Sequence, residues 1–385
     1  MSLKTKKLLF VFGTRPEVIK LAPVIRRAKE NPRFEVKVCS TGQHKEMIQP
    51  LLEFFAIKPD FDLGLMRPKP DLTDLVTAAM VGVRDIIRQE KPDYAVIQGD
   101  TSTCLATALA AFHEKCPLAH VEAGLRSGDI QSPWPEELNR KAVTLVAAQH
   151  FSPTSRASKV LESEGVAKNA VHLVGNTVID ALLDVSQRID SDKDLQKSLS
   201  DRFHFLDSSK RLLLVTTHRR ESFSGGLESI LNALKDIARE PDVQILFAVH
   251  LNPEVRKQVA AVLEGTAVWV DRLKGSSHFF LCDPLPYLEF VYLMKKAYFI
   301  LSDSGGVQEE APGLGKPVLV LREVTERPEA VEAGTSALVG FEQKKITAMA
   351  HELLTNVAAY KKMAQAKNPF GDGHSSEKIL EILGL

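Results

Sequence analysis

Short apolar runs alternate with amphipathic helical stretches along almost the whole chain. The first half contains six apolar, β-branched runs that predict strands, at residues 8–12, 36–40, 94–98, 118–121, 149–152 and 171–174. Helical periodicity separates these runs, for example at 16–30 and 103–114. Apolar strands that alternate with helices are typical of a parallel sheet covered on both faces.

A second cycle of strands follows a polar, charge-rich stretch at residues 190–209. Its predicted strands are 212–216, 244–249, 267–270, 279–282, 299–301 and 318–321. The length of 385 residues suits two domains of ordinary size. We therefore predict two Rossmann-like doubly wound α/β domains, residues 1–185 and 186–373, with a linker within roughly 180–210. A last helix at 375–383 follows the break NPFGDG, and segment 374–385 is compatible with packing back on the first domain.

Charge and hydropathy exclude several classes of function. Lys plus Arg and Asp plus Glu both number 49, so the formal net charge is zero. A balanced charge gives no bulk attraction to nucleic acid or to an anionic membrane, so phosphate binding would require a local pocket. No apolar run approaches the roughly 20 residues of a membrane helix, and the run at 8–12 is too short for a signal peptide.

The four cysteines are scattered along the chain and form neither a CxxC motif nor a pair with metal-ligand spacing; they are Cys39, Cys104, Cys116 and Cys282. Such cysteines are typical of small buried hydrophobes in a reducing compartment. The sequence also contains no HExxH motif and no calcium-binding loop. We therefore expect a soluble cytoplasmic protein that holds no metal.

Polar residues follow directly after six of the predicted strands. The segments are 13–15, 41–44, 99–101, 122–124, 218–221 and 302–306. Ligands of doubly wound sheets bind beyond the carboxyl ends of the strands, so these six segments are expected to line that edge of each sheet. Facing edges of the two domains would then enclose one cleft.

The segment LSDSGGVQEEAP, residues 301–312, predicts a strand, a tight turn and a helix. Ser304, Gly305 and Gly306 would expose backbone N–H groups at the helix start, which favours a phosphate. The acidic pair Glu309 and Glu310 could receive ribose hydroxyls. An ordinary N-cap with acidic residues in the first turn is equally consistent with this segment.

A second helix start, GTRPEVIK at residues 13–20, carries Arg15 and Lys20. Both cations could compensate a diphosphate, and Arg15 is the stronger candidate because a guanidinium binds phosphate in a bidentate manner. The dinucleotide signature GxGxxG is absent. GLGKP at 313–317 is not a P-loop, because Pro317 stands where Ser or Thr is required.

Three carboxylates of the first domain follow strands or begin a helix: Asp100, Glu122 and Glu136. Two carboxylates that share a cleft raise one pKa, which provides a base and an acid at neutral pH. N-capping by Asp100 and a surface helix start at Glu136 are the alternative interpretations.

One histidine lies in a charged turn and two others end apolar strands. His218 begins the cluster HRRESF, together with Arg219, Arg220 and Glu221, at an edge where catalytic groups gather. His120 and His250 each end an apolar run, which is more typical of hydrogen-bonded core histidines.

Eleven motifs, taken in order from residue 12 to residue 373, resemble those of the UDP-N-acetylglucosamine 2-epimerases. They are FGTRPEVIK, STGQHKEM, QGDTSTCLATALAAF, HVEAGLRSGD, SPWPEELNR, GNTVIDALL, HRRESF, VHLNPEVR, SDSGGVQEEAPGLGKPVLVLRE, TERPEAVEAGT and NPFGDG. The series covers nearly the whole chain and is far more specific than any single motif.

The resemblance implies a fold of the glycosyltransferase-B type, a homodimer, UDP-N-acetylglucosamine as substrate and no cofactor. By motif, it assigns Asp100, Glu122, Glu136 and His218 to catalysis, and Arg15, Lys20, Phe290, Ser304, Gly305, Gly306, Glu310 and Arg327 to substrate binding. It also implies a second substrate molecule as an activator near Gln43, His44, Arg219 and His250.

The chain departs from the family pattern at few positions. Thr217 stands where many members have Gly, and Leu285 stands where Gln is common, which puts a side-chain contact to the uracil region in doubt. Phe290 remains available to stack on the base. Glu46 stands where some activated members are expected to have Gln, so the activator is an open expectation.

The expected reaction is reversible epimerisation at C2, by elimination of UDP to a 2-acetamidoglucal and re-addition. We also expect the domains to close on the substrate so that the glucal is retained. Four alternatives remain: a hydrolysing epimerase, an epimerase of a related UDP-2-acetamido sugar, a glycosyltransferase and a non-catalytic sensor.

Overall fold

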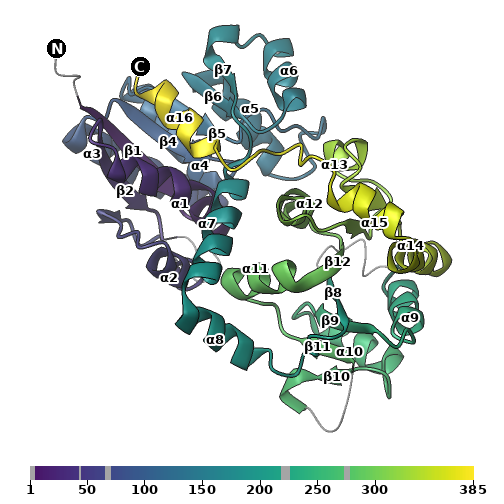
Figure 1. Cartoon of the computed structure of the whole chain (residues 1–385). Coiled ribbons are helices and arrows are strands. Elements are labelled where there is room, and N and C mark those ends of the chain that lie inside the picture. The colour runs from purple at the N-terminus through teal and green to yellow at the C-terminus, as the bar shows by residue number, and fades with distance from the viewer. Residues whose placement is uncertain (1–4, 43–44, 66–70, 218–225, 273–277) are drawn as a thin grey trace. The chain divides into compact units, whose positions relative to one another are not determined.

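The computed structural model describes residues 5–42, 45–65, 71–217, 226–272 and 278–385, without the side chains of residues 45–47 and 272. Its contacts group the chain into two compact units. Unit 1 comprises Met1–Ala181 and Phe370–Leu385, and unit 2 comprises Leu182–Pro369. Each unit contains one sheet and the helices that cover it (Figure 1).

The sheet of unit 1 has seven strands in the order β3-β2-β1-β4-β5-β6-β7, and all its neighbouring strands are parallel. The strands are β1 (Lys6–Phe12), β2 (Phe34–Ser40), β3 (Phe61–Asp62), β4 (Tyr94–Gln98), β5 (Leu118–Val121), β6 (Gln149–Ser152) and β7 (Val171–Leu173). Its helices are α1 (Arg15–Glu30), α2 (Lys45–Phe54), α3 (Leu72–Glu90), α4 (Ser102–His113), α5 (Glu136–Val146), α6 (Ser155–Ser163), the first turn of α7 (Thr177–Ser191) and α16 (Ser375–Leu383).

The sheet of unit 2 also has seven parallel strands, in the order β10-β11-β9-β8-β12-β13-β14. They are β8 (Arg211–Thr216), β9 (Val243–Ala248), β10 (Val268–Trp269), β11 (Phe279–Cys282), β12 (Ala297–Ser302), β13 (Val318–Val320) and β14 (Ser336–Leu338). The helices are α8 (Lys193–Arg202), α9 (Leu227–Ile237), α10 (Pro253–Val262), α11 (Tyr287–Lys296), α12 (Gly305–Glu310), α13 (Pro328–Glu332), α14 (Gln343–Thr355) and α15 (Val357–Ala364).

The predicted fold class is confirmed, because each sheet is parallel and its strand order reverses at the first strand of the unit. A right-handed crossover on either side of such a reversal places helices on opposite faces of the sheet. The central strands are therefore covered twice, and residues 8–12 of β1 are all fully buried. This explains why they read as continuous apolar runs.

Two short edge strands were not predicted from the sequence, and two helices occupy the stretch that was expected to be a linker. β3 and β14 have two and three residues and lack a long apolar run. The polar stretch expected to be a linker is largely helical, because α7 and α8 occupy most of residues 177–202. Asp192 caps α8 by accepting the backbone N–H groups of Asp194 and Leu195.

The last helix, α16, packs on α1 in unit 1. Its first N–H groups, those of Ser375 and Ser376, donate to the buried Asp180 carboxylate of α7 at 3.2 and 2.7 Å. A carboxylate at a helix start satisfies N–H groups that have no partner within the helix. Among the described helices, none is long and apolar enough to cross a membrane.

Gly124 provides a test of the packing at the end of β5. Its φ is +92°, and a Cβ on it would lie 2.9 Å from the carbonyl carbon of Ala157 and 3.0 Å from the Leu161 side chain. We expect Gly124→Ala to lower the free energy of unfolding by about 3 kcal/mol, because the strain of a left-handed alanine adds to the collision of its Cβ with the Ala157 backbone. Urea unfolding followed by circular dichroism measures the loss.

Gly165→Ala is the matched control for this change. Gly165 has a similar φ of +89°, but a Cβ on it would meet nothing within 4 Å. Its substitution should therefore cost only the strain, about 1 kcal/mol. Equal losses in the two variants would contradict the packing described for Gly124.

Candidate active site

The loops that follow β1 and β4 are joined by one buried carboxylate, Glu17 of α1. Its two oxygens accept the backbone N–H groups of Gly13 and Thr14 at 2.9 and 2.7 Å and the hydroxyl of Thr101 at 2.7 Å. Burial raises the pKa of Glu17, while these donors oppose the shift. Arg15, the first residue of α1, and Asp100, on the loop after β4, are thereby brought to the same edge of the sheet.

An ion pair connects α1 to the end of β5. The Lys20 ammonium donates to both oxygens of Glu122, at 2.6 and 2.7 Å, and the exposed fractions of the two side chains are 16% and 6%. Gln98 donates to one Glu122 oxygen, and Asn176 donates to the other at 2.8 Å. The backbone at Glu122 is left-handed, with φ of 64°. The structure thus brings together Lys20 and Glu122, which were predicted separately.

Asp100 is held by α5. The guanidinium of Arg140 donates to its carboxylate at 2.7 and 2.8 Å, and the Asn139 amide donates to its backbone carbonyl at 2.8 Å. Asp100 does not cap α4: the capping residue is Thr101, whose hydroxyl accepts the N–H of Cys104. The capping interpretation of Asp100 is therefore wrong.

Glu136 is the first residue of α5 and is half-buried. Its carboxylate makes no hydrogen bond or ion pair with any described residue, whereas that of its neighbour Glu137 does. Glu137 is fully buried and accepts from Arg140 at 3.1 Å and from the Ser127 N–H at 3.1 Å. Glu136 is thus the first residue of the helix that also carries Arg140, the partner of Asp100.

In unit 2, the residues predicted to hold a diphosphate lie around the start of α12. Ser304 is the N-cap residue, and the guanidinium carbon of Arg327 lies 3.8 Å from the position that a Cβ would take on Gly305. Arg327 also pairs with the buried Glu309. The start of α12 thus brings together four of the residues predicted to bind substrate: Ser304, Gly305, Gly306 and Arg327.

The remaining predicted residues of unit 2 lie on α11, at the end of α12 and after β9. Glu310 accepts a hydrogen bond from the Tyr287 hydroxyl at 2.9 Å, and Phe290, on the same helix as Tyr287, is half-buried. His250 is half-buried, with Nδ1 accepting the Asn252 N–H at 3.1 Å. It is not part of the core, so that interpretation of His250 is wrong.

Several predicted residues lie outside the described part of the chain. They are His218, Arg219, Arg220, Glu221, Gln43 and His44. The roles that the sequence assigns to them stay predictions.

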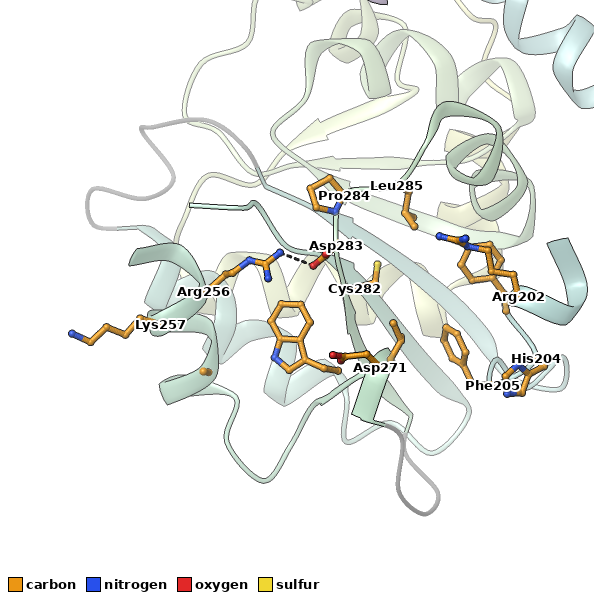
Figure 2. A pocket seen from close by; sticks show the side chains of 14 residues that line it. Arg202, His204, Phe205, Arg256, Lys257, Asp271, Cys282, Asp283, Pro284 and Leu285 are labelled. Carbon is orange, nitrogen blue, oxygen red and sulfur yellow. Dashed lines mark hydrogen bonds and ion pairs between the residues drawn. The ribbon is translucent and has the colours of Figure 1, made fainter. Parts of the chain in front are cut away.

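Unit 2 also contains a hollow of about 670 Å³ that the sequence did not indicate (Figure 2). Residues 202–205, α10 and the segment 282–285 line it. Arg256 donates to Asp283 at 2.5 Å and lies over the Trp269 ring, 5.1 Å from its centroid. Its lining includes Leu285 but none of the residues predicted to bind substrate, so it is not the site built above.

Sequence reasoning missed Glu17, Gln98, Arg140 and Asn176, which hold the predicted carboxylates and their loops. Each lies within a motif that had been noticed, but no spacing in the sequence indicates which distant residue it contacts. The described ranges contain no group of three or more His, Cys, Asp or Glu that could hold a metal ion. All four cysteines are buried and unpaired, and burial raises the pKa of Cys39 to about 12.

Comparisons with known proteins indicate one family. A family model described as UDP-N-acetylglucosamine 2-epimerase matches residues 26–384. The chain is 48% identical over 378 residues to the UDP-N-acetylglucosamine 2-epimerase of Yersinia pestis, covering 98% of each chain.

Solved structures are similar over the same extent. The Neisseria meningitidis UDP-GlcNAc 2-epimerase bound to UDP-GlcNAc matches at a TM-score of 0.87 and 42% identity, covering 98% of this chain and 99% of that one. The Methanocaldococcus jannaschii enzyme in complex with UDP-GlcNAc and UDP matches at 0.76 and 35%, with 98% and 99% covered.

His120 provides a test of the electrostatics beside Asp100. It is 1% exposed, its Nε2 lies 2.7 Å from the Gly99 carbonyl, and burial lowers its pKa to about 4. Between pH 6.5 and 4 the unfolded chain binds a proton there that the folded chain does not, so stability falls as the pH falls through this window. This placement confirms the interpretation of His120 as a core histidine.

We expect His120→Gln to reduce the loss of stability on acidification, because Gln can donate to Gly99 but does not titrate. From about pH 7 to about pH 5 the wild type should lose about 2 kcal/mol more unfolding free energy than the variant. Urea unfolding at the two pH values measures this difference. Identical pH dependence in the wild type and the variant would refute the assignment.

Proposed function

This chain belongs to the UDP-N-acetylglucosamine 2-epimerase family, and from that premise we propose that it interconverts UDP-N-acetylglucosamine and UDP-N-acetylmannosamine without hydrolysis. The observation that carries the proposal is the cluster of carboxylates at the carboxyl edge of the unit 1 sheet. Glu122 is paired there with Lys20, and Asp100 lies on a loop that Glu17 connects to the loop before α1. Nucleotide binding alone would not require such a cluster.

The chemistry requires UDP to leave before the proton does. The hydrogen on C2 is not next to a carbonyl, so no enolate can share the charge that its removal creates. Departure of UDP from C1 makes the ring oxocarbenium-like, which acidifies the neighbouring C–H bond. Loss of that proton gives a 2-acetamidoglucal and bound UDP; re-addition of UDP with protonation on the opposite face inverts C2.

Three carboxylates would divide this work according to their partners. Glu122 accepts from the Lys20 ammonium and two amides, which favours its charged form, so it suits electrostatic stabilisation of the ring cation. Asp100, paired with Arg140, suits a base. Glu136, whose carboxylate has no partner among the described residues, is the third candidate for proton transfer.

Unit 2 would hold the leaving group. The backbone N–H groups of Ser304, Gly305 and Gly306 and the Arg327 guanidinium would stabilise the diphosphate. Arg15 is the other cation that the sequence assigns to this role. Glu310 would accept ribose hydroxyls, and Phe290 would stack on the uracil. His218 would orient the diphosphate, as the family resemblance implies.

We also propose that the enzyme acts as a homodimer in the cytoplasm. Helix α4 packs against both α3 and α5 in unit 1, and each of the three helices exposes large apolar side chains. Val81 is 39% exposed, Phe112 60%, Leu138 46% and Leu145 86%. Exposed large apolar residues on three neighbouring helices favour a surface that another protein covers. A second UDP-N-acetylglucosamine as activator, near Gln43, His44, Arg219 and His250, is the remaining part of the proposal.

The proposed reaction is tested by incubation with UDP-N-acetylglucosamine in deuterium oxide, followed by proton NMR. We expect UDP-N-acetylmannosamine that carries deuterium at C2, because the protonating carboxylate exchanges with solvent. Free N-acetylmannosamine would instead identify a hydrolysing epimerase, and turnover only with an added acceptor would identify a glycosyltransferase. A panel of related UDP-2-acetamido sugars tests the substrate.

Variants of the carboxylates provide the control for this experiment. Asp100→Asn and Glu122→Gln should each lower kcat by about 10²–10⁴-fold while UDP still binds in calorimetry. Near-normal turnover in either variant would remove that residue from the catalytic group.

The homodimer is tested by Leu145→Arg, which places a charge among the exposed apolar residues of α3, α4 and α5. A buried, unpaired charge should separate the subunits, so light scattering after gel filtration is expected to give the mass of one chain. Val357→Arg is the matched control, because Val357 is 62% exposed on α15 of unit 2. A dimer that survives Leu145→Arg unchanged would exclude this surface.

A further inference from the structure

Asn176 contacts the proposed active site at one end of its side chain and a helix at the other. It is 1% exposed, and its Nδ2 donates to Glu122 Oε1 at 2.8 Å. Its Oδ1 accepts the backbone N–H of Val178 at 3.1 Å, in the first turn of α7. The two contacts require opposite ends of the amide, so together they determine which way the amide faces.

The backbone of Asn176 makes a third connection. Its N–H donates to the Phe370 carbonyl at 2.6 Å, where the chain re-enters unit 1. Gly175, just before it, has φ of +97°, and a Cβ there would lie 3.2 Å from the Gly371 Cα. Only glycine allows the two segments to approach this closely.

Asn176 therefore lies where both connections between the units leave unit 1. The first connection is α7, which begins at Thr177 and continues past Ala181 into unit 2. The second is the return from Pro369 to Phe370. One residue thus binds the start of α7, the returning segment and the Glu122 carboxylate.

We infer that Asn176 is a positioning residue: it holds Glu122 in its working orientation and links that orientation to both chain connections. Glu122 directly follows β5 in a left-handed backbone conformation, and a strained backbone of this kind persists only where the surrounding structure holds it. Lys20 on α1 and Gln98 on β4 donate hydrogen bonds to the Glu122 carboxylate. Asn176 donates to it from the point where the two connections between the units leave unit 1. This inference rests on the proposed role of Glu122.

Asn176→Asp tests the inference, because it removes the donor to Glu122 but keeps an oxygen to cap α7. We expect kcat for UDP-N-acetylglucosamine to fall by about 10²-fold, as for other small misplacements of reacting groups, with KM changed by less than about threefold. A kcat within threefold of the wild type would overturn the inference.

Asp180→Asn is the matched control. Asp180 is fully buried on α7, one turn beyond Asn176, and binds the N–H groups of Ser375 and Ser376 at the start of α16. This variant disturbs the same junction without touching Glu122, so it should lower the melting temperature and keep kcat within about threefold of wild type. An equal loss of kcat in Asp180→Asn would show that the effect is structural and overturn the inference.

A double-mutant cycle measures the contact without relying on activity. In the Glu122→Gln background the new amide can donate to the carboxylate that Asn176→Asp introduces. Asn176→Asp should therefore lower the melting temperature less in that background than in the wild type. Additive changes would show that the two side chains do not interact and overturn the inference. If the wild type makes no product from UDP-N-acetylglucosamine, the proposed function fails, while the cycle still decides whether Asn176 holds Glu122.

Discussion

The largely buried ion pair between Lys20 and Glu122 is the interaction around which the unit 1 site is organised. Removing two charges from water is costly, and their mutual attraction compensates only when further hydrogen bonds satisfy both groups. Gln98 and Asn176 provide those bonds to Glu122. Lys20 on α1, Gln98 at the end of β4 and Asn176 after β7 therefore all contact Glu122 at the end of β5, although these segments are far apart in the chain.

Parallel pairing makes this convergence possible. Every strand of the unit 1 sheet runs in the same direction, so the loops at the carboxyl ends all emerge at one edge. Glu17 and Arg140 then set the spacing within that edge, Glu17 between the loops after β1 and β4, and Arg140 between Asp100 and α5. The same arrangement in unit 2 places Ser304 at the end of β12 beside Arg327.

The candidate site was predictable in its residues but not in its contacts. Arg15, Lys20, Asp100 and Glu122 were found because polar residues after apolar strands are local signals. Their partners were missed, because Arg140 and Asn176 lie 40 and 54 positions from the carboxylates that they hold. The error at His250 has a related cause: the end of an apolar run predicts burial of the strand, not of the first residue beyond it.

The sequence by itself determined the fold class, the positions of nearly all the longer strands and the family to which the chain belongs. These follow from short-range patterns: apolar runs, helical periodicity and ordered motifs. Only the tertiary structure decided that Thr101 rather than Asp100 caps α4, that residues 177–202 are largely helical, and that the C-terminal helix binds Asp180 on α7. These features depend on contacts between side chains that are far apart in the sequence. Such contacts produce no local or periodic pattern from which they could be predicted.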